Sequence, residues 1–303
     1  MIETMGAQVT VLTNPTAGAG RAGRVAAAAV DQLRRRGLPV AVIWGRNALH
    51  AAELAQASVE RSDAALVVVG GDGMVHLAAQ VLSGTSIPLG VVPAGSGNDV
   101  ARMLGLPQHS AAGAADVIAD ALVDRRIGSV DVAAVSAAGL TAQVVSALAT
   151  GFDARVNERA ARMRAWWGRS RYAAATVAEL GCFTPLQYSL RLDGVRTDVE
   201  AILVAVCNGP TYGGGLPICP PADPRDGLLD VVIVEAMSTA QLLRATPRLL
   251  RGTHTHHRSY QHLRARTVSI EAADVVTYGD GERLISPPMA VTVQPGALQM
   301  LAR

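Results

Sequence analysis

The chain has 303 residues, of which 50% are apolar and 17% are charged. This length favours two domains, and the composition predicts a buried core rather than a disordered chain. A formal net charge of +2 gives no broad basic face, so we expect no nucleic-acid partner. All 27 basic residues are arginine, which excludes the lysine-based phosphate sites of Walker-A proteins and protein kinases.

No apolar run reaches the roughly 20 residues that cross a bilayer. Met1–Gly6 lacks the basic and apolar regions of a signal peptide. Cys182, Cys207 and Cys219 are odd in number and contain no C-x-x-C pair, a pattern typical of reduced thiols. We therefore expect a cytoplasmic protein.

Short apolar runs alternate with helical patterns over residues 1–130, which predicts βα units around a parallel sheet. The expected strands are Gln8–Thr13, Val40–Trp44, Ala64–Val69 and Leu89–Val92. The expected helices are Arg21–Arg36, Leu49–Arg61, Val75–Leu82 and one that begins over Asp99–Leu104. A glycine-rich turn joins strand to helix three times, which predicts that all three turns lie on the edge where open α/β sheets bind ligands.

Beyond Asp131 the pattern predicts a mostly antiparallel β domain over residues 131–294. The expected strands are Val132–Ser136, Gln143–Ala149, Leu186–Leu192, Ala201–Val206, Leu229–Val234, Thr267–Ile270 and Met289–Val293, with helical insertions near Asn157–Leu180 and Thr239–Leu250. The domain boundary is expected between Gly128 and Asp131. Residues 295–303 are left free to pack back on the first domain.

The first glycine turn is Asn14-Pro15-Thr16-Ala17-Gly18. Main-chain N–H groups at the helix start that follows form a natural phosphate cradle. Residues 18–23 also match the dinucleotide pattern G-x-G-x-x-G, but the acidic residue expected about 20 positions later is absent. An ordinary strand-to-helix turn explains the same residues.

The second turn, Gly70-Gly71-Asp72-Gly73-Met74, lets the backbone approach a ligand and places Asp72 to meet Mg²⁺ or a hydroxyl. The third turn, Pro93–Asp99, offers Ser96, Asn98 and Asp99 as caps or ligands at a helix start. Capping alone explains Asn98 or Asp99. It does not explain why three such turns share one sheet edge.

The patterns N-P-x-x-G, G-G-D-G and P-x-G-[ST]-x-N-D, in this order, resemble the catalytic domain of diacylglycerol and sphingosine kinases. NAD kinases share the G-G-D-G pattern and the fold. Tyr212–Gly215, Asp223–Asp230, Gly279–Glu282 and the segment Gly151–Arg162 are similar to signatures of bacterial, particularly actinobacterial, diacylglycerol kinases. The resemblance implies a doubly wound, NAD-kinase-like α/β domain, a C-terminal β-sandwich domain for the lipid, and an active site in the cleft.

The same resemblance implies the roles of individual residues. ATP would be bound by Asn14, Pro15, Thr16, Ala17, Gly18, Gly70, Gly71, Asp72, Gly73, Met74, Ser96, Asn98 and Asp99. Asp280 would be the general base, Glu282 would support it or the metal, and Asp72 would contact ATP–Mg²⁺. A second, structural Mg²⁺ is implied at Asp223, Asp226 and Leu228. An exposed hairpin turn explains Gly279–Glu282 without a catalytic role. A solvated acidic loop explains Asp223–Asp230 without a metal.

Three positions depart from the family pattern. Met74 stands where a threonine is usual, His76 where an asparagine is usual, and Gly45 near the place of a nucleotide-contacting threonine. Loss of the threonine hydroxyl at Met74 would weaken nucleotide contacts or alter donor preference. The H-x-H-H run from His254 to His257 lacks a fourth metal ligand nearby, which favours a loop or helix end.

The segment Arg155–Arg171 contains six arginines around Trp166 and Trp167, and we hypothesise that it lies on an anionic membrane surface. A helix packed on the sandwich is the alternative. The expected function is transfer of the γ-phosphate of ATP to diacylglycerol, giving phosphatidic acid, by a peripherally membrane-associated enzyme. The alternative enzymes are a kinase for another lipid alcohol (sphingoid base, ceramide or monoacylglycerol) and an NAD kinase. A catalytically silent lipid- or nucleotide-binding module is the alternative from another class. A homodimer is left open.

Overall fold

The computed structural model describes residues 8–13, 22–162 and 184–302. The chain forms two compact units, the first made of residues 1–132 with 296–303 and the second of residues 133–295. It passes from one unit to the other inside two strands, β5 (Gly128–Ala137) and β15 (Met289–Met300). Among the described residues, no helix is long and apolar enough to span a membrane.

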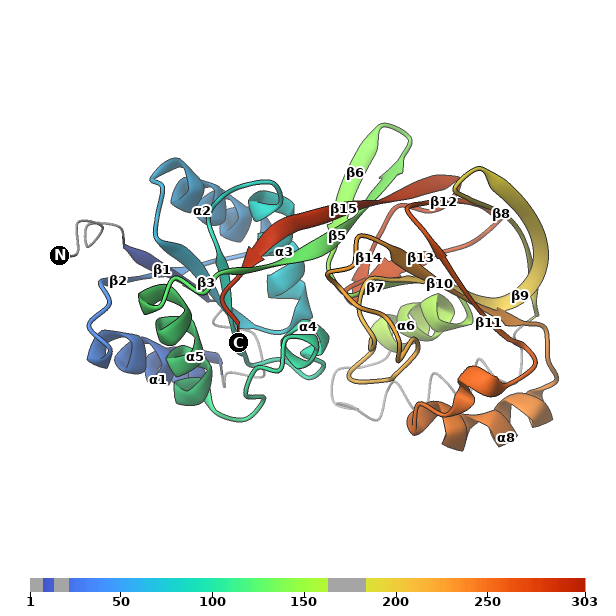
Figure 1. Ribbon diagram of the computed structural model, residues 1–303, viewed down its shortest axis with the longest axis horizontal. Helices are drawn as coiled ribbons and strands as arrows, with labels where there is room; N and C mark the ends of the chain where they lie inside the picture. The colour runs from blue at the N-terminus through green and yellow to red at the C-terminus, as the bar shows by residue number, and fades with distance from the viewer. Residues whose placement is uncertain (1–7, 14–21, 163–183, 303) are drawn as a thin grey trace. The chain divides into compact units, whose positions relative to one another are not determined.

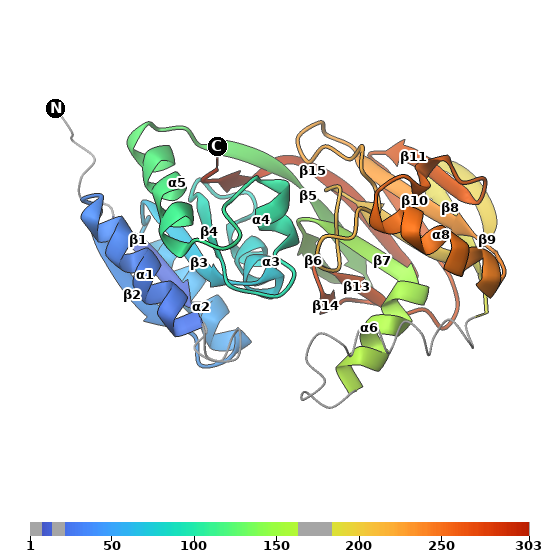
Figure 2. The ribbon, with the colours of Figure 1, turned by 90° about the horizontal axis from the view of Figure 1, so that it is seen from below.

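The first unit is a parallel sheet with helices on both faces (Figures 1 and 2). Its strands are β1 (Val9–Thr13), β2 (Val40–Trp44), β3 (Ala65–Gly70) and β4 (Leu89–Pro93), in the spatial order β2-β1-β3-β4. Its helices are α1 (Ala22–Arg35), α2 (Ala48–Glu60), α3 (Asp72–Leu82), α4 (Asp99–Met103) and α5 (Ala111–Val123). Helices α1 and α5 pack together over one face, and α2 and α3 pack against β1 and β3 from the other.

Strands β1, β3 and β4 are buried along their whole length. Helices cover both faces, which is why these strands are continuous apolar runs in the sequence. Because the strands are parallel and in register, Thr13 lies beside Val69, and Val69 beside Val92. The turns after β3 and β4 therefore lie side by side at one sheet edge, whereas residues 14–21 after β1 lie outside the described residues.

The last residues of the chain belong to the first unit. Met300 pairs in parallel with Leu89, and the N–H of Leu301 donates to the carbonyl of Leu89 at 2.9 Å. The N–H of Gly296 donates to Oδ1 of Asp131 at 2.7 Å, and Asp131 is only 2% exposed. A buried carboxylate thus fixes the point where β15 enters the unit.

The second unit is a β-sandwich-like fold of mostly antiparallel strands. Besides parts of β5 and β15, its strands are β6 (Leu140–Val144), β7 (Ala147–Gly151), β8 (Leu186–Leu192), β9 (Val195–Cys207), β10 (Leu229–Glu235), β11 (Tyr260–Ala265), β12 (Thr267–Glu271), β13 (Thr277–Gly279) and β14 (Glu282–Arg283). Its helices are α6 (Phe152–Arg162), α8 (Thr239–Leu250) and the short 3₁₀ helix η3 (His254–His256). Strand β9 pairs with β8 through its first half and lies between β7 and β10 through its second half.

Alternation along β9 and β10 divides the unit into two apolar layers. Val206 and Val231 face the central core, whereas Ala205 and Val232 face a second cluster on the other side of the sheet. Side chains on a strand alternate between faces, so one strand can serve both layers. The second cluster is covered by the segment 208–228 and by α8.

The sequence-based elements need three corrections. The expected strand Gln143–Ala149 is two strands, β6 and β7, because main-chain groups at 145 and 146 bond Asp280 instead of a sheet neighbour. The expected helix near Asn157–Leu180 begins at Phe152, and residues 163–183 lie outside the described residues. Helix α5 and strands β11, β13 and β14 were not predicted.

Candidate active site

The turns after β3 and β4 touch backbone to backbone. A Cβ on Gly95 would lie 2.4 Å from the Cα of Gly71, and one on Gly71 would lie 3.0 Å from the Cα of Gly95. The N–H of Ala94 donates to the carbonyl of Gly70 at 2.8 Å. Because no side chain fits between them, the two turns form one continuous main-chain surface.

Asp72 joins the two turns by capping a helix that belongs to the other turn. Its Oδ1 accepts a hydrogen bond from the N–H of Val100 in the first turn of α4, at 3.3 Å. Asn98, the residue that precedes α4, makes no capping bond and has a left-handed backbone with φ of 57°. Its side chain instead accepts from the N–H of Gly95 at 2.9 Å and donates to the Gly95 carbonyl at 3.2 Å. The cap expected from the local sequence is therefore supplied by Asp72.

The remaining predicted nucleotide ligands differ in exposure. Ser96 is exposed at the tip of its turn, whereas Asp99 is 4% exposed. Gly70 ends β3, Gly71 is the N-cap of α3, and Gly73 lies in the first turn of α3. Asn14, Pro15, Thr16, Ala17 and Gly18 lie outside the described residues. Of the three predicted cradles, the structure brings the second and third together.

Met74, the main departure from the family pattern, is buried against the turn that precedes it. A Cβ on Gly70 would lie 2.5 Å from the Cγ of Met74, so the methionine packs over that glycine. Met74 is 9% exposed, and His76 is partly buried on the same helix. Gly45 makes a similar close approach, since a Cβ there would lie 2.7 Å from the Cβ of Ala51. Met74 and Gly45 therefore fit the packing of α3 and α2.

Asp280, the predicted general base, is 6% exposed and anchors three hydrogen bonds. Its Oδ2 accepts from the N–H of Val145 at 2.9 Å. Its Oδ1 accepts from the N–H and the hydroxyl of Ser146 at 2.8 Å and 2.7 Å. Asp280 and Gly281 both have positive φ, as in the tight hairpin turns that join two strands directly. The predicted hairpin is thus present, but its aspartate points inward.

Sequence reasoning missed Ser146 and Asn208, which hold this arrangement. The side chain of Asn208 donates to the carbonyl of Val145 at 2.8 Å, and its N–H donates to the carbonyl of Ser146 at 2.8 Å. The 145–146 segment is therefore clamped between Asp280 and Asn208. We call Ser146, Asn208 and Asp280, with the main chain of 145–146, the Asp280 cluster. Asn208-Gly209 beside the Tyr212–Gly215 pattern was the available signal.

Glu282 does not share the environment of Asp280. It begins strand β14 opposite Gly279 and is exposed. A Cβ on Gly279 would lie 2.5 Å from Leu284, which explains the glycine before the turn. Two carboxylates two residues apart are thus divided between the interior and the solvent.

The predicted structural-metal residues lie in one exposed loop. Oδ1 of Asp223 accepts from the N–H of Arg225 at 3.1 Å, and Oδ1 of Asp226 accepts from the N–H of Leu228 at 3.0 Å. The other carboxylate oxygen of Asp226 is ion-paired with Arg264 of β11. Carboxylate and main-chain oxygens suit Mg²⁺. An ion at Asp226 would therefore replace the guanidinium of Arg264.

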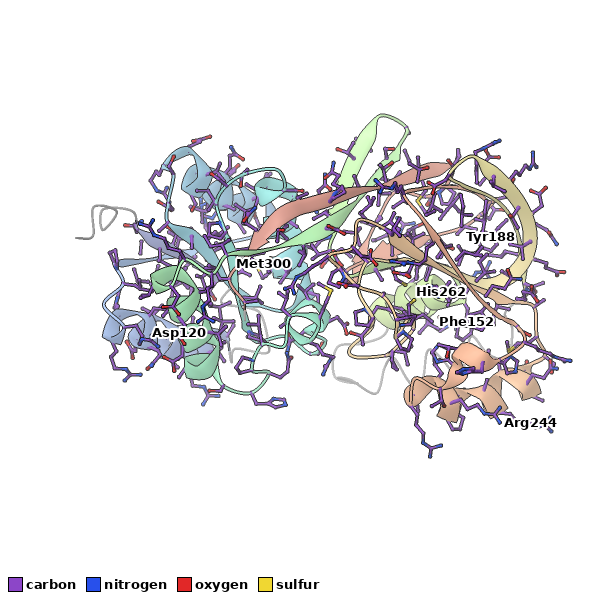
Figure 3. All side chains as sticks on the ribbon, in the orientation of Figure 1. Asp120, Phe152, Tyr188, Arg244, His262 and Met300 are labelled. Carbon is purple, nitrogen blue, oxygen red and sulfur yellow. The ribbon has the colours of Figure 1, made fainter. Side chains whose placement is uncertain are left out.

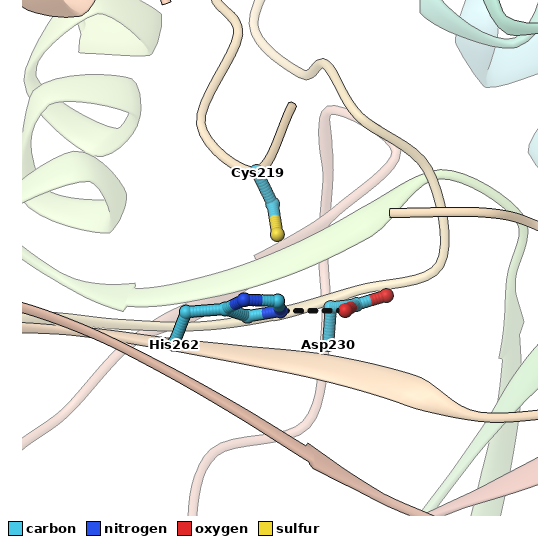
Figure 4. Close-up of side chains that lie close together, drawn as sticks. All are labelled: Cys219, Asp230 and His262. Atoms are coloured by element: carbon cyan, nitrogen blue, oxygen red, sulfur yellow. Dashed lines mark hydrogen bonds and ion pairs between the residues drawn. The ribbon is translucent and has the colours of Figure 1, made fainter. Parts of the chain in front are cut away.

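A second group of side chains that could bind a metal joins the segment 208–228 to strands β10 and β11 (Figure 4). The ligand atoms of Cys219, Asp230 and His262 lie within 4.8 Å of one another. Nε2 of His262 is 2.6 Å from Oδ1 of Asp230, and Nε of Arg264 is 3.5 Å from the same oxygen. Asp230 is 1% exposed, so the His262 ring and the Arg264 guanidinium stabilise one oxygen of a buried carboxylate. Among the described residues, its other oxygen, Oδ2, is buried without a hydrogen-bond partner.

The two described cysteines are buried free thiols. The neighbouring Cys219 thiol and burial raise the pKa of Cys207 well above its usual value. Cys182 lies outside the described residues. For Cys207 and Cys219, the expectation of reduced thiols agrees with the structure.

The histidine run does not form a metal group among the described residues. Nε2 of His254 donates to the carbonyl of Ile218 at 3.1 Å, and its ring meets Tyr260 edge-on at 4.9 Å. His254 is buried, whereas His256 is exposed. Trp166, Trp167 and most of the predicted membrane segment lie outside the described residues.

An open groove of about 690 Å³ lies over β8 and β12 of the second unit. It contains none of the predicted site residues. It is lined by Gln187, Tyr188, Ser189, Asp198, Glu271, Ala272, Ala273 and Pro288. We assign it no ligand.

Comparison with known proteins decides the family. Residues 8–135 match the diacylglycerol kinase catalytic domain, and residues 146–302 match the YegS C-terminal NAD kinase beta sandwich-like domain. A diacylglycerol kinase of Mycobacterium tuberculosis is 41% identical over 296 residues, which cover 97% of this chain and 94% of the relative. The chain belongs to the bacterial diacylglycerol kinase and YegS-like lipid kinase family.

More distant members of the lipid kinase family agree. A Pseudomonas aeruginosa protein named Probable lipid kinase YegS-like is 27% identical over 280 residues, covering 91% of this chain and 88% of that protein. Two crystal structures of diacylglycerol kinases from Bacillus anthracis match this chain with TM-scores of 0.81 and 0.73 and 22% sequence identity. The matches cover at least 98% of this chain and 97% of each of those chains. The expected pair of an α/β domain and a β-sandwich-like domain is confirmed.

Proposed function

We propose that this lipid kinase transfers the γ-phosphoryl group of ATP to the hydroxyl of diacylglycerol, forming phosphatidic acid. The observation that carries the proposal is the 41% identity to a diacylglycerol kinase over 97% of the chain. The geometry of the two touching glycine turns and of the inward-pointing Asp280 supports it. We assign the first domain to the nucleotide and the second to the lipid.

The main-chain surface of Gly71 and Gly95 would receive the triphosphate. Close approach of phosphate oxygens to main-chain N–H groups needs positions without side chains, and both glycines meet this need. Asn14–Gly18, Gly70–Met74 and Ser96–Asp99 would complete the nucleotide site. Because the chain contains no lysine, main-chain dipoles, arginine and Mg²⁺ are the groups that would stabilise the phosphate charge.

The reaction would be an in-line displacement with Asp280 as the proton acceptor. The acceptor hydroxyl oxygen attacks the γ-phosphorus, and the bond from that phosphorus to the β–γ bridging oxygen breaks. ADP leaves with the electron pair of that bond, and the hydroxyl proton passes to an Oδ of Asp280. The hydrogen bonds from Val145 and Ser146 would hold the carboxylate in one orientation. Glu282 and Asp72 would assist at the metal-bound phosphates.

Two magnesium sites belong to the proposal. When bound with ATP, Mg²⁺ neutralises part of the triphosphate charge and orients the γ-phosphoryl group. Asp223, Asp226 and the Leu228 carbonyl would hold the structural ion once Arg264 has withdrawn from Asp226. We further propose a cytoplasmic protein that visits the membrane surface to reach its acceptor.

The test is a thin-layer assay of labelled phosphate transfer from ATP to diacylglycerol, monoacylglycerol, ceramide and a sphingoid base. We expect diacylglycerol to be the best acceptor and Asp280→Asn to lose roughly 100-fold or more of the rate. Ser146→Ala removes one hydrogen bond to the same carboxylate and serves as the matched control, with a rate within a few-fold of wild type. Transfer to another alcohol in preference to diacylglycerol would change the assigned substrate. An unaltered rate in folded Asp280→Asn would remove its assigned role, and tight lipid binding without any turnover would favour the silent module.

A further inference from the structure

Helix α8 presents an exposed face although it is a well-formed helix. Its inner side packs Leu242 and Leu249 against the second apolar cluster, yet no residue of the helix is buried. Leu243 is 55% exposed and Leu250 is 65% exposed. Ser238 and Gln241 form a capping box at its start, which stabilises the helix without further packing.

From Leu243 onward, the exposed side chains divide into two parallel stripes. They are Leu243, Arg244, Pro247, Arg248, Leu250 and Arg251, which we call the α8 face. At about 100° per residue, the three apolar positions span roughly 60° of the helix surface and the three arginines span the adjoining 60° or so. Figure 3 shows Arg244 at the outer side of the helix, pointing away from the strands.

The sequence around the α8 face is basic. Between Glu235 and Glu271 the sequence contains six arginines and no aspartate or glutamate. Two other arginines of the unit have carboxylate partners, since Arg264 pairs with Asp226 and Arg196 with Asp198. Within the described residues, no carboxylate forms an ion pair with the three arginines of the α8 face. An anionic partner is therefore the complement of this surface.

We propose that the α8 face docks on an anionic lipid bilayer, with Leu243 and Leu250 at the boundary of the acyl chains and the arginines on lipid phosphates. The proposal rests on the proposed lipid-kinase function, which brings the protein to the bilayer that holds its acceptor. Helices that carry arginines beside large apolar side chains lie in the plane of such interfaces. A second copy of the chain fits less well, because two identical arginine stripes would repel each other.

The binding test is co-flotation of the full-length protein with vesicles of phosphatidylcholine alone or mixed with phosphatidylserine. We expect binding only to the mixed vesicles and a loss with added salt. Leu243→Gln/Leu250→Gln should weaken binding about tenfold or more, because glutamine keeps the helix but not the apolar stripe. Arg244→Gln/Arg248→Gln should weaken it about fivefold for each arginine.

Matched controls come from exposed residues elsewhere in the same unit. Leu140→Gln/Val195→Gln changes two side chains that are 61% and 69% exposed. Arg191→Gln/Arg196→Gln removes the same charge from the β8–β9 hairpin. Both control proteins should bind the mixed vesicles as wild type does. Equal flotation of the α8-face and control variants would overturn the proposal, as would a monomer–dimer shift confined to the α8-face variants in sedimentation without any change in flotation.

Activity separates this inference from the function on which it rests. The Leu243→Gln/Leu250→Gln protein should phosphorylate a short-chain diacylglycerol in free solution at the wild-type rate and vesicle-borne diacylglycerol several-fold more slowly. A wild-type protein that binds vesicles through α8 but phosphorylates neither substrate would refute the proposed function alone. If the Leu243→Gln/Leu250→Gln protein phosphorylated both substrates at the wild-type rate and floated as wild type does, the docking alone would be refuted.

Discussion

The two main-chain junctions of this lipid kinase are built in opposite ways. In the first unit, the turns after β3 and β4 meet because Gly71 and Gly95 have no side chains. In the second unit, the turn at Asp280 meets the 145–146 segment because the Asp280 side chain points inward and accepts hydrogen bonds from Val145 and Ser146. The first junction should therefore fail when an atom is added, and the second when atoms are removed.

Removal of the central carboxylate should have the largest effect on stability. Asp280→Ala leaves the N–H groups of Val145 and Ser146 buried without their acceptor, so we expect a loss of about 2–5 kcal/mol in the free energy of unfolding. Urea unfolding followed by circular dichroism measures it. Ser146→Ala, which loses one donor only, should cost about 1 kcal/mol. Equal stability of Asp280→Ala and wild type would show that the carboxylate has no structural role.

Addition of one methyl group should break the glycine junction. Gly95→Ala places a Cβ 2.4 Å from Gly71, and the backbone must move, at a cost of about 1–3 kcal/mol. ATP affinity, measured by calorimetry, should fall with it. Gly23→Ala is the matched control, because a Cβ at that position in α1 meets nothing within 4 Å. It should stabilise the protein by about 0.5–1 kcal/mol, and a similar loss in both variants would contradict the close approach.

Acid should weaken the second unit before the first. Burial lowers the pKa of His254, so the folded state disfavours its charged form and stability is lost as pH falls through the ordinary value of 6.5. Burial alone would raise the pKa of Asp63, but hydrogen bonds from Arg61, Ser58 and Thr10 leave it lowered. Stability from Asp63 is therefore present above 3.8 and is lost as pH falls through its lower folded value.

Hydrogen exchange read by mass spectrometry, corrected for the intrinsic pH dependence, resolves the two units. Between pH 7 and 5, exchange should accelerate around η3 and β11 and stay constant around β1. His254→Phe should remove this early change, whereas Asp63→Asn should not. Simultaneous loosening of both units near pH 6.5 would contradict the separation.

The smallest stability effect is expected at Ser96. Its side chain is exposed, so Ser96→Ala should change the free energy of unfolding by less than about 0.5 kcal/mol. If the hydroxyl contacts a phosphate, ATP affinity should still fall roughly fivefold, the equivalent of one hydrogen bond of about 1 kcal/mol. Calorimetry compares the variant with wild type. Unchanged affinity would remove Ser96 from the nucleotide site.

Much of the fold follows from local patterns. Continuous apolar runs predicted β1, β3 and β4, because strands covered on both faces need apolar side chains at every position. The strand Gln143–Ala149 was wrong because its interruption depends on Asp280, more than a hundred residues away. The cap of α4 was misplaced for the same reason, since Asp72 supplies it across a turn.

By itself, the sequence determined most of the elements of the first unit, the two-domain organisation, the absence of lysine and the family patterns that name the candidate residues. Tertiary structure alone decided that Gly71 touches Gly95, that Asp280 points inward while Glu282 faces solvent, and that Asp226 pairs with Arg264. The reason is physical. Periodicity and turn preference act between neighbours in the chain, whereas burial, main-chain contact and ion pairing are decided between segments that meet only when the chain folds.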